Sequence, residues 1–360
     1  MKKTLLIFAA ALMLCAPLAG AQSKAPVYPS AEEGWKKVKP EKHGFSKKAL
    51  DDLTEFLVDS TYATGVAVIV GGEMIYSFGV LDRLSYIASC RKSVMAMMYG
   101  KYVENGTINL NETVEELGLD DIGGLLPIEK KARVIDLVTA RSGCYHPASN
   151  AGDSKDKPAR GTKKPGKYFL YNNWDFNVAG AVFEMKTGKN IYDAFQEDIG
   201  SRIGLQDWNR EEQKKGGNLK VSVYPAYHFY FSTRDMARIG YLMLRDGNWN
   251  GDQVISTEWV RRITSPVSPY KEVRGRHSVP RFSYGYMWWL FDDAAPENTP
   301  AFHGGYTARG AMGQYITVLP ELDMVVAFKT DAKYKRSTPS SAYFRFLDRL
   351  VAIARPGAAE

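Results

Sequence analysis

Residues 314–328, QYITVLPELDMVVAF, contain two apolar runs on either side of a short turn. β-Branched and aromatic residues fill Gln314–Leu319 and Met324–Phe328, so both runs are predicted to be strands. The intervening Pro320-Glu321-Leu322-Asp323 has the residue types that join two strands in a hairpin. We therefore expect an antiparallel pair near the C-terminus.

A second hairpin is predicted near the other end of the chain. Val66–Val70 and Met74–Phe78 flank Gly71-Gly72, which favours a two-residue turn. Strand character returns at Tyr284–Phe291, ahead of the C-terminal pair.

Helical patterns surround and separate these strands. Ser46 is a predicted N-cap for a helix that carries Leu50, Leu53, Phe56 and Leu57 on one face. Apolar residues at helical spacing predict the other helices: 91–104, 134–140, 174–186, 191–196, 233–244 and 340–354. The segment 147–167 is polar and rich in glycine and proline, which is typical of a long surface loop.

The order of these elements predicts an α+β fold, an α/β sandwich in which an antiparallel sheet is flanked by helices. The sandwich is expected to comprise residues 22–88 and 227–360. Residues 89–226 are expected to form an inserted, mostly helical domain.

The first 21 residues have the pattern of a secretory signal peptide. Lys2 and Lys3 precede a short apolar run, and Ala19-Gly20-Ala21 supplies a cleavage site. The alternative is a membrane anchor, but the run is shorter than the ~20 residues that span a bilayer. We expect a periplasmic or secreted protein with no stable membrane insertion after cleavage.

Composition limits the possible partners and cofactors. The net charge of +7 is spread along the chain, so it indicates solvated faces rather than a nucleic-acid surface. Only Cys90 and Cys144 remain after signal cleavage, and neither lies in a metal-binding cluster. We expect no metal, no other cofactor and no nucleic-acid partner.

Ser89-Cys90-Arg91-Lys92 is an S-x-x-K at the start of a predicted helix. Residues three apart share a helix face, so the Lys92 amine can reach the Ser89 hydroxyl and act as its base. The pattern also occurs at Ser154 and Ser268, but neither of those opens an apolar helix. The alternative for Ser89 is a simple helix N-cap.

Two further stretches carry polar groups suited to acyl transfer. Tyr171-Asn172-Asn173 is a Y-x-N, in which a phenol can relay protons and an amide can orient the lysine. A tyrosine in such an aromatic stretch is otherwise a core residue. His303-Gly304-Gly305 precedes the last hairpin and could let a substrate approach a strand edge, or could be turn material.

Together and in this order, the S-x-x-K, Y-x-N and His-Gly-Gly motifs resemble the signatures of the serine β-lactamase and penicillin-binding protein superfamily. The class C-like branch is most similar, which includes esterases, D-amino-acid peptidases and aminohexanoate-oligomer hydrolases. The resemblance extends from Phe45 to the C-terminus. It includes DLVTARSG at 136–143, STRDMAR at 232–238 and YGYMWW at 284–289.

The resemblance implies a role for each matching residue. Ser89 would be the nucleophile, Lys92 the general base, Tyr171 the proton relay and Asn173 an orienting, substrate-binding amide. His303 would occupy the lysine position of the family's K-T-G motif. Gly305 would lie beside the substrate, and the Tyr306 N–H would help to bind the oxyanion.

The expected activity is hydrolysis of a small ester, amide or peptide through an acyl-Ser89 intermediate. Since neutral histidine is a poorer anion anchor than lysine, His303 favours general esters or amides over penicillins. The alternatives are a β-lactamase or D,D-peptidase acting on cell-wall peptides, and a non-catalytic wall-binding protein with the same fold.

Overall fold

The computed structural model describes residues 26–150, 152, 157–273 and 279–354. The predicted signal peptide lies outside these residues. No helix in the described ranges is both long enough and apolar enough to cross a bilayer.

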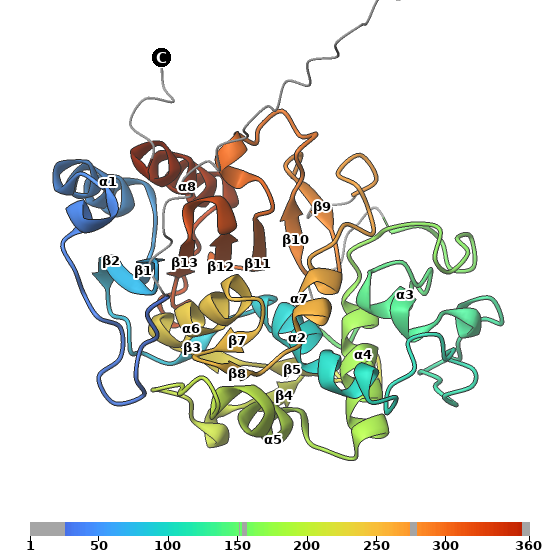
Figure 1. The fold of residues 1–360 in the computed structure, drawn as a ribbon. Helices are drawn as coiled ribbons and strands as arrows, with labels where there is room; N and C mark the ends of the chain where they lie inside the picture. The colour runs from blue at the N-terminus through green and yellow to red at the C-terminus, as the bar shows by residue number, and fades with distance from the viewer. Residues whose placement is uncertain (1–25, 151, 153–156, 274–278, 355–360) are drawn as a thin grey trace, which may run out of the picture.

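A seven-stranded antiparallel sheet forms the centre of the molecule (Figure 1), with strand order β2-β1-β13-β12-β11-β10-β9. Its strands are β1 Gly65–Val70, β2 Glu73–Gly79, β9 Phe282–Tyr284, β10 Trp289–Phe291, β11 Tyr306–Gly310, β12 Gln314–Leu319 and β13 Met324–Lys329. Both predicted hairpins are confirmed, and β1 pairs directly with β13. This pairing joins the two ends of the chain in one sheet.

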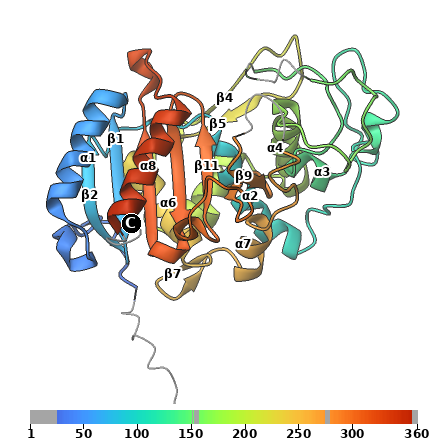
Figure 2. The ribbon, with the colours of Figure 1, turned by 90° about the horizontal axis from the view of Figure 1, so that it is seen from above.

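Helices cover both faces of the sheet, as Figures 1 and 2 show. Helices α1 (Lys47–Ser60) and α8 (Ser340–Ala354) lie on one face, where Tyr343 of α8 stacks on Tyr315 of β12. Helix α6 (Thr233–Leu244) lies on the other face. Gly240 allows its close approach, because a Cβ there would lie 2.5 Å from Val325 Cγ1. The predicted α+β sandwich is confirmed.

The segment between the two parts of the sandwich is mainly helical. It contains α2 (Cys90–Glu104), α3 (Val134–Val138), α4 (Asn173–Thr187) and α5 (Ile191–Phe195). Helix α2 contacts β11 and β12 on one side and α4 on another, and 12 of its 15 residues are buried. Helix α2 is therefore enclosed between the sheet and the other helices. The boundaries at 88/89 and 226/227 stay predictions.

Some elements differ from the sequence prediction. The expected strand 284–291 is two short strands, β9 and β10, because Gly285–Trp288 forms a tight turn with Met287 at φ 58°. Helix α7 (Thr257–Ile263) and strand β11 were not predicted. The remaining strands are β3 Ser85–Tyr86, β4 Lys214–Gly216, β5 Ala226–His228, β6 Tyr230–Phe231, β7 Asn248–Trp249 and β8 Asp252–Gln253.

Short helical turns complete the described chain. They are η1 Pro40–His43, η2 Glu129–Lys131, η3 Gln196–Gly200, η4 Arg210–Glu212, η5 Pro300–Phe302, η6 Pro320–Leu322 and η7 Ala332–Tyr334. Strand β3 pairs with β6 immediately before α2, and the Ile87 N–H donates to the Phe229 carbonyl. These bonds fix the position at which α2 begins.

Candidate active site

Ser89 lies at the start of α2 and is partly exposed. Its side chain makes no capping hydrogen bond to the helix, so the N-cap alternative does not account for its hydroxyl. The preceding residue, Ala88, has a left-handed backbone with φ 49°. Such a conformation is unfavourable for alanine and is often retained at functional sites.

The Lys92 amine lies one helical turn further on and contacts three polar groups. Its Nζ is 3.1 Å from Ser89 Oγ, 2.6 Å from the Tyr171 hydroxyl and 2.7 Å from Asn173 Oδ1. The side chain is only 1% exposed, and its Nζ also lies 4.5 Å from the Phe176 ring centroid. The structure therefore brings all four of these predicted site residues into one contact group.

Tyr171 and Asn173 reach Lys92 from the start of α4. Between them, the Asn172 side chain donates to the Cys144 carbonyl and to Asp175, which fixes the approach to the helix. The Tyr171 ring stacks on Trp289 of β10, with 5.4 Å between ring centroids. Burial raises the pKa of Tyr171, so its phenol is neutral and carries a proton at neutral pH.

A cleft of about 310 Å³ opens beside these groups. Its lining includes Ser89, Tyr171 and Asn173, and the opposite wall comes from the end of β11 and the residues after it. The complete lining is Tyr86, Ala88, Ser89, Asn150, Gly152, Tyr171, Asn173, Trp289, Arg309, Gly310, Ala311, Tyr315 and Ser340.

His303, Gly305 and Tyr306 do not reach this cleft, which corrects the sequence prediction. The His303 side chain is 63% exposed, and its Nδ1 lies 2.8 Å from Asp293. The Gly305 N–H donates to the Phe302 carbonyl, and the Tyr306 side chain is buried against Trp288. All three lie at or before the start of β11, whereas Ser89 lies beside its far end.

Sequence reasoning missed the residues at that far end, Arg309, Gly310 and Ala311. A Cβ on Gly310 would lie 2.5 Å from the Ile87 carbonyl and 3.2 Å from Ala88 Cβ, so glycine allows β11 to approach the nucleophile segment. The Arg309 guanidinium lies over the Trp289 ring at 4.6 Å and supplies a cation to the cleft wall. The glycines of Gly310-Ala311-Met312-Gly313 were the available signal.

Cys90 and Cys144, the two cysteines in the described part of the chain, are free and buried, and neither offers a second nucleophile. Cys90 Sγ donates to the Gln314 carbonyl, and burial raises the pKa of its thiol. In the described part of the chain, His, Cys, Asp and Glu form no group of three or more that could hold a metal ion.

The family model named Beta-lactamase matches residues 51–348, which include every residue of the Lys92 contact group. The chain belongs to this family. It is accordingly a serine hydrolase of the β-lactamase type, and the suspected resemblance is confirmed.

Several solved structures share the fold. A putative 6-aminohexanoate-dimer hydrolase from Bacillus anthracis is 19% identical, with a TM-score of 0.65 over 91% of this chain and 89% of that one. EstCE1, a hydrolase with promiscuous acyltransferase activity, is 14% identical, with a TM-score of 0.61 over 88% and 99%. A penicillin-binding protein homologue from Caulobacter crescentus is 14% identical, with a TM-score of 0.62 over the same shares.

Substitutions at the two ends of β11 test which end of this strand lies beside Ser89. In Gly310→Val the new side chain should displace the Ser89 segment and lower kcat/KM for p-nitrophenyl butyrate by at least ~10-fold, since small misplacements cost that much or more. His303→Ala should retain kcat/KM within about twofold, because His303 is exposed and lies outside the cleft lining. A large loss in His303→Ala together with an active Gly310→Val would contradict the placement.

Proposed function

We propose that this chain is an exported hydrolase that cleaves a small ester or amide through an acyl-Ser89 intermediate. The observation that carries the proposal is the simultaneous contact of Lys92 Nζ with Ser89, Tyr171 and Asn173. A serine hydroxyl needs a neighbouring base to become a nucleophile, and Lys92 is the basic group in contact with it.

In the first step the Lys92 amine accepts the Ser89 proton as Oγ attacks the substrate carbonyl. The carbonyl oxygen becomes an oxyanion, which backbone N–H groups can stabilise. The Ser89 and Ala311 N–H groups are suited to this role. Both residues line the cleft, and neither N–H donates to another group within the described residues. Ala311 thus replaces Tyr306 as the second proposed donor.

Collapse of the tetrahedral intermediate requires a proton for the leaving group. The neutral Tyr171 phenol can donate this proton and recover one from the Lys92 ammonium, 2.6 Å away. Asn173 Oδ1 holds the lysine in position through this exchange. Water then attacks the acyl carbon while its proton passes to the lysine–tyrosine pair. The bond to Ser89 Oγ breaks, the pair returns a proton to Oγ, and the acid product leaves.

Arg309 supports a second candidate substrate class, one that carries a carboxylate. The sequence argument against penicillins relied on His303 facing the substrate, and His303 lies outside the cleft. Arg309 places a permanent cation in the cleft wall, which suits a substrate with a carboxylate. A β-lactamase or D,D-peptidase activity on cell-wall peptides is therefore the alternative to general ester or amide hydrolysis.

The proposal extends to location and partners. The predicted signal peptide places the mature chain in the periplasm or outside the cell, without stable membrane insertion. Its partner is the small-molecule or peptide substrate rather than a nucleic acid, and the chemistry derived above uses only side chains and backbone groups.

A substrate panel with Ser89→Ala as control tests this proposal. The wild-type chain should hydrolyse short-chain p-nitrophenyl esters or anilides, and Ser89→Ala should lose at least ~10³-fold in kcat, since the nucleophile is removed. Turnover of nitrocefin with no ester or anilide hydrolysis would favour the β-lactamase alternative. No turnover on the entire panel would support the non-catalytic alternative and overturn the proposal.

Tyr171→Phe tests the proton relay. Loss of the phenol should lower kcat by ~10²-fold or more with little change in KM, because the hydroxyl acts after the substrate has bound. Tyr145→Phe is a matched control, since Tyr145 is also buried, lies outside the cleft lining and has an unpaired hydroxyl among the described residues. Equal kcat values in the two variants would exclude Tyr171 as the relay.

A further inference from the structure

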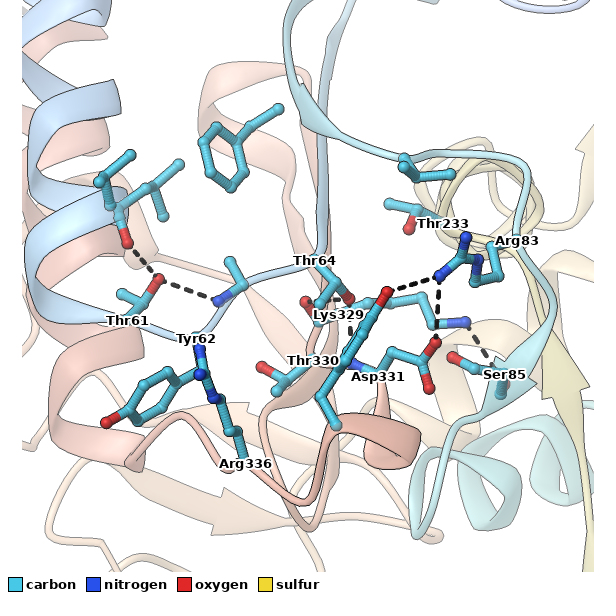
Figure 3. A pocket seen from close by; sticks show the side chains of 16 residues that line it. Thr61, Tyr62, Thr64, Arg83, Ser85, Thr233, Lys329, Thr330, Asp331 and Arg336 are labelled. Carbon is cyan, nitrogen blue, oxygen red and sulfur yellow. Dashed lines mark hydrogen bonds and ion pairs between the residues drawn. The ribbon is translucent and has the colours of Figure 1, made fainter.

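A second cavity, of about 460 Å³, lies on another part of the sandwich (Figure 3). It is bounded by the end of α1, the end of β2, strand β3, the first residue of α6 and the loop after β13. It is larger than the Ser89 cleft and shares no lining residue with it. The acyl-transfer proposal assigns it no role.

Lys329, the last residue of β13, supplies a buried cation to this cavity. Its side chain is 2% exposed, and no carboxylate of the described chain forms an ion pair with it within 4.0 Å. Its Nζ donates to the backbone carbonyls of Ser85 and Phe231, which occupy two of the three ammonium protons. Burial lowers the pKa of Lys329 to about 7, which the Asp331 charge partly opposes. An incoming anion would compensate this cation.

Further donors surround Lys329 at the same end of the cavity. Arg83 donates to the Tyr334 hydroxyl at 2.8 Å and lies 3.9 Å from Asp331. The hydroxyls of Ser85 and Thr233 line the cavity, and in the described structure neither has a hydrogen-bond partner. Figure 3 shows Arg83, Ser85, Thr233 and Lys329 gathered at this end, away from Thr61 and Tyr62.

The charges in the lining leave a positive surplus. Two arginines, Arg83 and Arg336, and the partly protonated Lys329 line the cavity, against the single carboxylate of Asp331. Asp331 lies 3.9 Å from both Arg83 and Lys333, so part of its charge is already compensated. The lining therefore favours an anion over a cation.

The other end of the cavity is apolar and unusually exposed. Leu57, Ala63 and Phe78 line it. Four large side chains of the whole lining face solvent, of which Tyr334 lies beside Arg83 and Val80 lies near Thr233. Val58 is 64% exposed, Tyr62 49%, Val80 49% and Tyr334 51%. Exposed apolar side chains gathered around one hollow are typical of a binding site.

We propose that this cavity is a second binding site, which takes a small amphipathic anion with a carboxylate head and an apolar body. The carboxylate would accept hydrogen bonds from Lys329, Arg83 and the free hydroxyls of Ser85 and Thr233. The apolar body would cover Leu57, Phe78 and Val80. The proposal does not rest on acyl transfer at Ser89, since no residue is common to the two sites.

Calorimetric titration of the full chain with sodium octanoate tests the proposal. Octanoate should bind with a 1:1 stoichiometry, whereas 1-octanol and octyltrimethylammonium should bind at least ~10-fold more weakly, because a charge-assisted hydrogen bond is worth about that factor. Arg83→Gln should weaken octanoate binding by a similar factor. Lys329→Met should also weaken octanoate binding. Lys329 is buried, so if Lys329→Met does not fold, the result for Arg83→Gln tests the proposal by itself.

Two arginine controls locate the binding. Arg309→Gln removes the cation of the Ser89 cleft, and Arg210→Gln removes a surface cation paired with Asp193. Both should bind octanoate as the wild type does. If Arg309→Gln lost octanoate binding and Arg83→Gln kept it, the carboxylate would lie in the catalytic cleft, and the proposal would be overturned. Unchanged binding in Arg83→Gln, or no binding to the wild type, would also overturn it.

Discussion

The contact between the Lys92 amine and three oxygen atoms joins α2 to the start of α4, and the site depends on it. Lys92 lies on α2, which begins beside the sheet, and Tyr171 and Asn173 lie at the start of α4 in the helical segment. Ser89 is fixed by the β3–β6 pair and by the left-handed backbone at Ala88. The geometry of the amine therefore depends on how the sheet and the helical segment pack together, and α2 is buried between them.

The opposite wall of the cleft depends on a close approach between two backbones. Gly310 lets the end of β11 contact the segment that carries Ile87 and Ala88, and Ala311 lines the same cleft as Ser89. A larger residue at position 310 would separate these backbones. The same strand carries Arg309 into the cleft, so the end of β11 and the residue after it supply both the cation and the proposed oxyanion donor.

Much of the fold follows from local patterns in the sequence. The two hairpins and helices α1, α6 and α8 have clear apolar periodicity, and these elements and α2 were predicted close to their observed positions. Strand β11 was missed because Tyr-Thr-Ala-Arg-Gly is short and has a charged residue facing the cleft. The S-x-x-K and Y-x-N pairs were identifiable because the chemistry needs those residue types.

The part of the site that follows the S-x-x-K and Y-x-N motifs could not be located from the order of the motifs alone. His303-Gly304-Gly305 precedes β11, and only the far end of that strand, at Arg309 and Gly310, lines the cleft. Which end of β11 faces Ser89 depends on the strand order of the whole sheet, and the φ of Ala88 depends on tertiary contacts. The second cavity is similarly invisible in the sequence, because its lining comes from four separate stretches of the chain, 57–64, 78–85, 233 and 329–336.

The central claim is that the Lys92 amine activates Ser89, and the rate of phosphonylation by a fluorophosphonate probe tests it most directly. The wild-type chain should gain one phosphonyl group, mapped by peptide mass to Ser89. Lys92→Met, checked for a native circular dichroism spectrum, should react at least ~10²-fold more slowly although Ser89 is present, because its base is gone. Equal rates in the two proteins, or labelling at another residue, would contradict the account.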